Sequence, residues 1–126
     1  MAITEEEFAI FEKKVYENDF ETFKDMVNKL DNINIVNKYG WTLLHITIRR
    51  DRRDMVAFLL EQGADINMTD AVGWTPLMEA IMDDMPDLVV FLVEKGADKT
   101  IANQRGATAP MLAQKFGRAN MYQYLG

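Results

Sequence analysis

Apolar residues recur along this chain in clusters that combine a helical spacing with a long period. Between residues 55 and 60, and again between 88 and 93, apolar side chains occupy positions i, i+1, i+3 and i+4, the spacing of one buried helical face. The corresponding pairs are Met55 and Leu88, Val56 and Val89, Phe58 and Phe91, Leu59 and Leu92, and Leu60 and Val93. Every pair is 33 positions apart, so the pattern predicts one helix that is repeated.

Two short motifs keep the same period. The first reads Gly-Trp-Thr-Leu-Leu at 40–44, Gly-Trp-Thr-Pro-Leu at 73–77 and, in weaker form, Gly-Ala-Thr-Ala-Pro at 106–110. The second, Gly-Ala-Asp, occurs at 63–65 and at 96–98. A shorter helix is expected after each copy of the first motif, with spans of about 43–50, 76–82 and 109–115. Each unit is therefore predicted to be a turn followed by two antiparallel helices.

The period, the Gly-x-Thr-Pro-Leu opening and the Gly-Ala-Asp-x-Asn closing from Gly63 to Asn67 resemble the ankyrin repeat family, over about residues 37–126. The resemblance implies an all-α ankyrin-repeat solenoid of about four helix-turn-helix units with finger-like hairpin loops. Residues 5–36 fit a diverged first unit with helices near 5–17 and 20–30. The expected single domain, 1–126, consists of an N-terminal capping repeat (1–36), two repeats (37–69 and 70–102) and a C-terminal capping repeat (103–126).

Residues at the predicted helix ends have suitable chemistry. A threonine hydroxyl before a first helix can accept a hydrogen bond from a free backbone amide. The threonines at this position are Thr42, Thr75 and Thr108. The family usually has glycine between the two helices, and Asn or Asp can adopt the same left-handed conformation at a modest cost. The residues at this position are Asn18, Asp51, Asp84 and Gly117.

The composition narrows the class of partner. The chain carries 20 acidic and 14 basic residues, a formal net charge of -6, which disfavours duplex nucleic acid because its phosphates would be repelled. We expect another protein with a basic docking region, no nucleic acid, no membrane, and a chain that is monomeric alone. Cysteine is absent and histidine occurs once, so no disulfide, metal site or cofactor is expected. The acidic residues 5–7 and the lack of a long apolar run favour the cytoplasm.

No arrangement typical of an active site is found in the sequence. Catalysis needs a nucleophile, base or metal near an oxyanion donor, and the chain has no Gly-x-x-x-x-Gly-Lys or Gly-x-Gly-x-x-Gly loop. His45 falls where ankyrin repeats have a histidine that ties neighbouring loops together, and Met78 and Met111 replace it in the next two units. We expect a structural His45 and no enzymatic activity. An enzyme would require an exposed His45 beside ordered carboxylates.

The resemblance places a set of residues on a concave wall formed by the fingers and the ends of the first helices. The candidate partner-binding residues are Lys38, Tyr39, Trp41, Arg49, Arg50, Val72, Trp74, Met82, Asp83, Arg105, Lys115 and Phe116. Trp41 and Trp74 have two compatible interpretations. Each indole can anchor a partner, since large rigid aromatic residues dominate binding hot spots, or it can pack on the neighbouring finger and stiffen the loops.

Charges of opposite sign recur one period apart, with a basic run at 49–53 and an acidic run at 82–87. Stacked units place equivalent residues side by side, so the expected neighbours are Arg50 with Asp83, and Arg52 with Asp84 or Met85. These residues can form an inter-repeat ladder of ion pairs, each worth at most about 1 kcal/mol when exposed. We favour a bipolar docking surface, because exposed aromatic residues and Met82 flanked by charge are typical of a protein interface.

These features predict a noncatalytic protein-binding module that recognises a folded partner through its concave face and finger loops. A narrower hypothesis is an inhibitor or immunity-type protein of a basic partner, for which the small size and acidic charge are suitable. The alternative is a structural or assembly subunit that stacks or oligomerises through its solenoid ends. The contact would then involve the C-terminal residues Phe116, Met121, Tyr122 and Tyr124.

Overall fold

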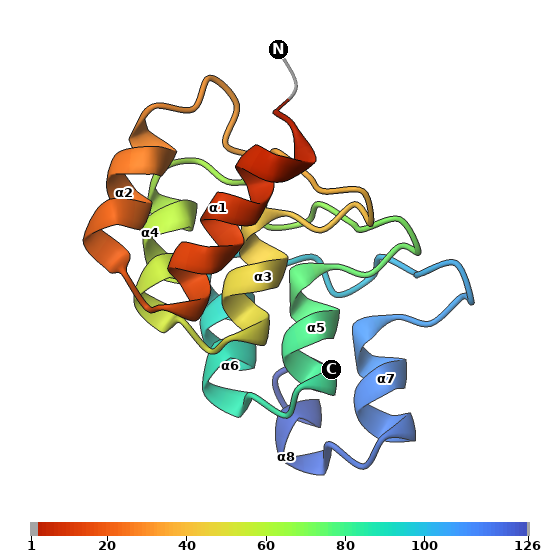
Figure 1. Cartoon of the computed structure of the whole chain (residues 1–126). Helices are drawn as coiled ribbons and strands as arrows, with labels where there is room; N and C mark the ends of the chain where they lie inside the picture. Colours follow the sequence, from red (N-terminus) through yellow and green to blue (C-terminus); the bar gives the residue numbers. More distant parts are fainter. Residues whose placement is uncertain (1–2, 126) are drawn as a thin grey trace. The chain divides into compact units, whose positions relative to one another are not determined.

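α-Helices joined by turns and loops build residues 3–125, the part of the chain that this computed structural model describes (Figure 1). In chain order they are α1 (Glu5–Tyr16), α2 (Phe20–Asn28), α3 (Leu43–Arg49), α4 (Arg53–Glu61), α5 (Pro76–Met82), α6 (Pro86–Glu94), α7 (Ala109–Lys115) and α8 (Ala119–Tyr122). The all-α fold class is confirmed, and the first helices of the repeats begin where the sequence predicts. Predictions that fall on Met1, Ala2 and Gly126 lie outside the described residues.

The helices are grouped into two compact units, Met1–Asp65 and Ile66–Gly126. In the first unit, α1 and α4 each pack against both α2 and α3 (Figure 1). The second unit follows the same plan, since α5 and α8 each pack against both α6 and α7. Each unit therefore holds two helix pairs, as the helix-turn-helix repeat requires.

Each unit has its own apolar core. Fully buried side chains of the first unit include Phe8, Phe23, Leu43, Leu44, Ile48, Met55 and Leu59. Those of the second unit include Leu77, Met78, Ile81, Leu88 and Leu92. Burying one such side chain is worth roughly 1.5–3 kcal/mol relative to leaving it exposed. Six of the ten residues that the 33-residue period aligns are thus buried, whereas Phe58, Leu60, Phe91 and Val93 are half-buried.

Two of the three predicted threonine caps are present. The Thr42 hydroxyl oxygen accepts a hydrogen bond from the His45 amide at 3.3 Å, and that of Thr75 accepts one from the Met78 amide at 3.2 Å. Thr108 precedes α7 but makes no side-chain cap, so the prediction for this residue is wrong. Thr108 is half-buried, whereas the other two threonines are buried. Water can therefore reach the start of α7 and take the place of the cap.

The predicted left-handed turns between paired helices are present. Asn18, Asp51 and Asp84 have φ angles of 56°, 55° and 56°, and Gly117 has a φ of 71°. This backbone region costs most residues with a Cβ atom roughly 1–2 kcal/mol, and Asn and Asp tolerate it better because their short side chains bond locally. The backbone of the turns at Asn18, Asp51 and Asp84 is therefore strained, and glycine at these positions would remove the strain.

Asn18→Gly is expected to raise the free energy of unfolding by about 0.5 kcal/mol, because glycine adopts the left-handed turn without strain, although it loses more chain entropy on folding. Asn18→Ala is the matched control and is expected to lower it by about 1 kcal/mol. Urea unfolding of the three proteins measures both changes. A glycine variant less stable than the wild type would contradict the strain at this turn.

An arginine at the start of α4 joins two repeats of the first unit. The Arg52 guanidinium donates hydrogen bonds to the carbonyl oxygens of Val15 and Tyr16, both at 2.9 Å, at the end of α1. Arg118, two periods later, makes the same pair of bonds to the last two carbonyls of α5, at 3.0 Å each. We call these two arrangements the arginine clamps. At the position between them, one period from each, the chain has Met85.

Arg52→Met is expected to lower the free energy of unfolding by about 2 kcal/mol, because hydrogen bonds to charged groups contribute roughly 1.5–3 kcal/mol each and water can replace part of the loss. Arg53→Met removes the same charge from a half-exposed side chain next to it. That control is expected to change stability by less than about 0.5 kcal/mol. Equal losses for the two variants in urea unfolding would show that charge, and not the clamp, is responsible.

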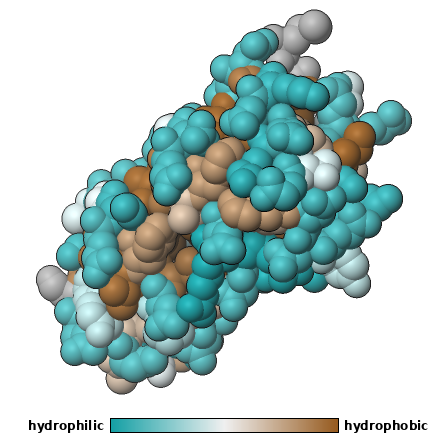
Figure 2. All heavy atoms as spheres, turned by 90° about the vertical axis from the view of Figure 1, so that its left-hand side faces the viewer, coloured by the Kyte–Doolittle hydropathy of each residue, from teal (hydrophilic) through white to brown (hydrophobic). Residues whose placement is uncertain are grey.

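The outer side chains of the helices are mainly polar. Figure 2 views the molecule from the side on which α2 lies, and hydrophilic residues cover most of that face, with apolar residues showing between them. Within residues 3–125, none of the helices combines the length and the apolar character that crossing a bilayer requires.

Candidate protein-binding surface

The loops before α3, α5 and α7 are held in one repeated conformation. In the first, the Asn37 side-chain oxygen accepts hydrogen bonds from the amides of Tyr39 at 2.9 Å and Trp41 at 3.0 Å. The Asn37 amide also donates to the Trp41 carbonyl oxygen at 3.1 Å. Asp70 and Asn103, each one period further on, make the equivalent bonds in the next two loops. These loops are the fingers that the resemblance implies.

The finger tips expose residues that the sequence nominates for binding. Tyr39 and Val72 are 51% and 52% exposed, and Arg105, which follows Val72 by one period, is also exposed. An exposed apolar group on a loop held by hydrogen bonds loses little conformational freedom when a partner binds. The tips are therefore suited to contact another protein.

Two cations flank a pair of aromatic rings in the first unit. The Lys38 ammonium nitrogen lies 5.2 Å from the centroid of the Tyr39 ring. The Tyr39 and Trp41 rings are 5.2 Å apart with an interplanar angle of 41°, and the Arg49 guanidinium carbon lies 4.2 Å from the Trp41 ring centroid. Such cation–π contacts are worth about 0.5–1 kcal/mol each at exposed sites. The structure thus brings four of the predicted residues together, and we call them the cation–aromatic row.

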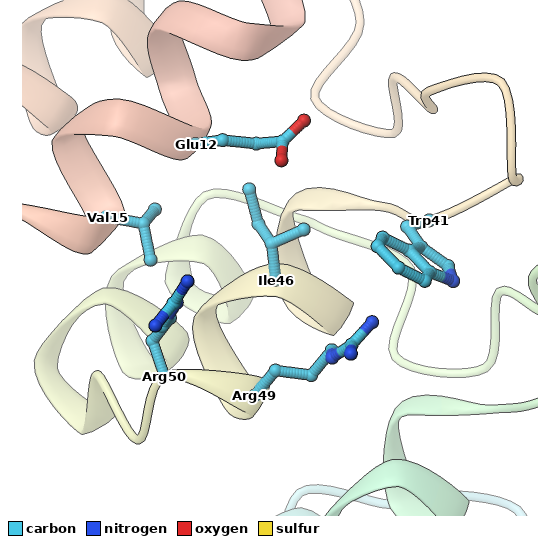
Figure 3. A pocket seen from close by; sticks show the side chains of 6 residues that line it. All are labelled: Glu12, Val15, Trp41, Ile46, Arg49 and Arg50. Carbon is cyan, nitrogen blue, oxygen red and sulfur yellow. The ribbon is translucent and has the colours of Figure 1, made fainter.

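A surface hollow of about 370 Å³ adjoins this row. Its lining residues are Glu12, Val15, Trp41, Ile46, Arg49 and Arg50. Figure 3 shows the Glu12 carboxylate on the α1 side, Arg49 and Arg50 at the end of α3, and Ile46 between them. The Arg50 guanidinium carbon lies 4.9 Å from the centroid of the Tyr16 ring. We call this feature the first-unit hollow.

A second hollow lies between two fingers of the second unit. Its lining residues are Val72, Trp74, Asn103, Gln104 and Arg105. Two hydrogen bonds join these fingers. The Gln104 side-chain amide donates to the Ala71 carbonyl oxygen at 2.8 Å, and the Gln104 backbone amide donates to the Val72 carbonyl oxygen at 3.1 Å. Three of the predicted residues therefore meet here.

The remaining predicted residues lie where α5 and α7 end. Met82 and Lys115 are the last residues of these helices, and Asp83 and Phe116 follow them. The Lys115 ammonium nitrogen lies 5.6 Å from the Phe116 ring centroid. All twelve residues thus lie on fingers or at the ends of first helices. Their union into one concave face, with Arg50 beside Asp83, stays a prediction.

The C-terminal contact expected of an assembly subunit is present only in part. Phe116, Tyr122 and Tyr124 are 43%, 44% and 41% exposed, as such a contact requires. Met121 is completely buried in the second unit, so the prediction that it joins the contact is wrong. Its apolar side chain fills the space between α8 and the helices against which α8 packs.

A comparison with known families bears on all these features. A family model of ankyrin repeats in three copies matches residues 12–103, most of the chain. The chain belongs to the ankyrin repeat family. Ankyrin repeats are generally protein–protein interaction modules. A search of curated proteins finds no matching relative. The ankyrin match includes residues 12–36, assigned from the sequence to a diverged cap, and stops before the helix pair α7 and α8.

The ankyrin histidine has the structural environment expected of it. His45 is completely buried, and its Nδ1 accepts a hydrogen bond from the Thr42 amide at 3.1 Å and lies 2.8 Å from the Thr42 hydroxyl oxygen. Because an amide can only donate, Nδ1 carries no proton and the ring proton is on Nε2. The His45 side chain is not exposed at the surface. At the equivalent position, Met78 is buried and Met111 is 55% exposed.

Sequence reasoning missed several residues of the ankyrin surface. The finger braces Asn37, Asp70 and Asn103 follow one another at intervals of 33, so the period alone could have identified them. Tyr16 precedes Arg49 by the same interval, which could have placed it at the end of a first helix. For Glu12 no comparable signal exists, because its part in the hollow depends on how α1 packs against α3.

Ionisable groups near the fingers have mainly structural partners. The Thr100 hydroxyl and amide donate to the Asp98 carboxylate at 2.6 and 2.8 Å, and these bonds lower the pKa of Asp98 below its ordinary value of 3.8. Asp98 therefore favours the folded state above that value, and this effect is lost as the pH falls through the lowered pKa. Among residues 3–125, no three histidine or acidic side chains gather as a metal site.

Proposed function

We propose that this ankyrin repeat chain is a noncatalytic binding module that recognises a folded protein through its fingers and the ends of its first helices. The observation that carries the proposal is the exposure of Tyr39 and Val72, 51% and 52%, on loops that hydrogen bonds hold in place. Rigid loops with exposed apolar tips and flanking charges provide pre-organised contacts, which lower the entropic cost of binding. The family, whose members generally bind proteins, supports the same conclusion.

The test is affinity capture from the native cell extract with three baits, each first shown to be folded by circular dichroism. The finger variant carries Tyr39→Ser and Val72→Ser. The control variant carries Ile10→Ser and Met111→Ser, which remove apolar groups that are equally exposed, at 50% and 55%, from α1 and α7. A protein that binds the wild type and the control, and not the finger variant, supports the proposal once calorimetry with purified components reproduces the difference. Equal capture by all three baits would remove the fingers from the site.

A narrower form of the proposal is an inhibitor or immunity-type protein that covers a basic surface of its partner. The net charge of -6 supports this form, because an acidic chain attracts a basic partner over long distances. The association rate should then fall steeply as salt is added, since steering between charged proteins is screened. An association rate that salt leaves unchanged would exclude electrostatic steering and count against a basic partner.

A second candidate function is assembly through the end repeats. Ile10 is 50% exposed, whereas Leu43, one period later, is buried, and Met111 is 55% exposed, whereas Met78, one period earlier, is buried. The first and last repeats thus expose apolar side chains at positions where the equivalent side chains of the middle repeats are buried. Sedimentation at several concentrations tests this function. Self-association that the Ile10→Ser and Met111→Ser control abolishes would favour it, and a monomer at every concentration would exclude self-assembly.

A further inference from the structure

The charge of the first-unit hollow is opposite to that of the whole chain. Arg49 and Arg50 line it together with one acidic residue, Glu12, and the adjoining cation–aromatic row adds Lys38. Two arginines and one acidic residue therefore line this hollow, in a chain whose formal net charge is -6. A carboxylate at the hollow responds mainly to these nearby charges, because exposed charges more than about 8 Å apart are largely screened at physiological salt.

We propose that the first-unit hollow binds an acidic segment of the protein partner, with an Asp or Glu carboxylate of that segment on Arg50. The inference rests on the proposed function and adds the chemistry of the partner at one place. Charge complementarity supports this occupant, since the guanidinium groups provide fixed donors for a carboxylate. A partner can be basic elsewhere and still present such a segment at this hollow.

Arg50 has the geometry that carboxylate binding requires. Its guanidinium lies over the face of the Tyr16 ring, with 4.9 Å between the guanidinium carbon and the ring centroid. A guanidinium held over a ring can still donate two parallel hydrogen bonds from its N–H groups to one carboxylate. Arg50 is exposed, and none of the described carboxylates of the first unit forms an ion pair with it. The ring thus holds a cation whose ion-pairing capacity is not used within the described residues of the first unit.

The rest of the hollow sets what can lie beside the carboxylate. Val15 and Ile46 are almost covered, with 1% and 6% of their surfaces exposed, so they provide little apolar contact area. Trp41 is half-buried and can contact a short aliphatic side chain of the segment. Glu12 faces the arginines across Ile46 (Figure 3) and repels a second carboxylate on the α1 side. The hollow therefore favours one acidic residue next to an apolar one over a continuous acidic run.

Amide NMR spectra of the full chain test the proposal with defined peptides. The probe is acetyl-Gly-Glu-Leu-Glu-Gly-amide, and its matched control has Gln in place of both Glu residues. The Glu peptide is expected to bind with a millimolar dissociation constant and to shift the Trp41 indole signal and the amide signals of Arg49 and Arg50 in a saturable way. The Gln peptide is expected to leave these signals in place.

Three variants separate local binding from general charge. Arg50→Gln is expected to weaken binding of the Glu peptide about tenfold, whereas Arg53→Gln, which removes the same charge outside the hollow, is expected to leave the affinity unchanged. Glu12→Gln is expected to tighten binding about twofold to threefold, because it removes the repulsion on the α1 side. Equal losses for Arg50→Gln and Arg53→Gln would overturn the proposal, because they would show attraction without a site.

Two further results would also overturn it. One is the absence of saturable shifts with the Glu peptide into the millimolar range. The other is a stronger effect of acetyl-Gly-Lys-Leu-Lys-Gly-amide on the same signals, which would indicate a basic segment at this position. Either result leaves the proposed function standing if affinity capture still depends on Tyr39 and Val72. Conversely, the Glu peptide could bind as expected while affinity capture no longer depends on Tyr39 and Val72. That combination would overturn the proposed function alone.

Discussion

Gly73→Ala is expected to lower the free energy of unfolding by about 3 kcal/mol. Gly73 has a φ of 86°, where a Cβ atom is strained, and a Cβ there would lie 3.0 Å from both the Asn103 Cα and the Gln104 backbone nitrogen. The left-handed backbone costs roughly 1–2 kcal/mol for a residue with a Cβ atom, and overpacking adds roughly 1–3 kcal/mol. Because both neighbouring atoms belong to backbone, they cannot move away by a change of rotamer. Urea unfolding of the two proteins measures the loss.

Gly106→Ala is the matched control for Gly73. Gly106 follows Gly73 by one period and has a similar φ of 80°, but a Cβ there would have no atom within 4 Å. The expected loss is therefore the backbone term alone, about 1 kcal/mol. The difference between the two variants measures how closely the fingers of the second unit approach each other. Equal losses would mean that these fingers can separate at little cost.

His45→Ala is expected to lower the free energy of unfolding by a similar amount, about 3 kcal/mol. The change leaves a cavity in a fully buried site and removes the acceptor of the Thr42 amide at 3.1 Å. Large-to-small changes in cores cost about 2–5 kcal/mol, and a buried donor without a partner costs about 1–3 kcal/mol. The two terms do not add fully, because the cavity lets water or a shifted side chain reach the amide. Urea unfolding with circular dichroism measures this change.

The chain itself provides the control for His45. Met78 occupies the equivalent position in the next repeat and is also buried. His45→Met should therefore fill most of the volume, lose only the hydrogen bonds and cost about 1 kcal/mol. If the methionine and alanine variants lose the same stability, the hydrogen bonds dominate and volume matters little. In either case the variants are expected to keep any partner that the wild type binds under conditions where they remain folded.

The helices could be predicted from the sequence because their causes are local and repeated. Apolar residues such as Leu59 and Leu92 define one buried face, and Thr42 and Thr75 mark the helix starts. The left-handed turns at Asn18, Asp51 and Asp84 were expected from the resemblance to ankyrin repeats, which usually have glycine at this position. The missing cap at Thr108 has no signal in the sequence, since its residue type and its place in the repeat are those of Thr42 and Thr75.

The candidate site was only partly accessible from the sequence. Lys38, Tyr39, Trp41 and Arg49 were nominated from their place in the repeat, and their ring and cation contacts agree with that place. The pairing of Arg50 with Tyr16 depends on the rotamers of two long side chains from different helices, which periodicity does not specify. The same limit applies to Arg52, whose guanidinium bonds the end of α1, a contact that the predicted ion-pair ladder did not include.

The arginine clamps imply that the pairing of repeats within each unit resists acid. Their acceptors are backbone carbonyls, and an arginine does not lose its proton in proteins, so neither partner of these bonds titrates as the pH falls. Ion pairs to carboxylates in general behave differently, because protonating a carboxylate removes the attraction. As the pH falls, the hydrogen bonds that Arg52 and Arg118 make to the ends of α1 and α5 thus persist after ion pairs to carboxylates are lost.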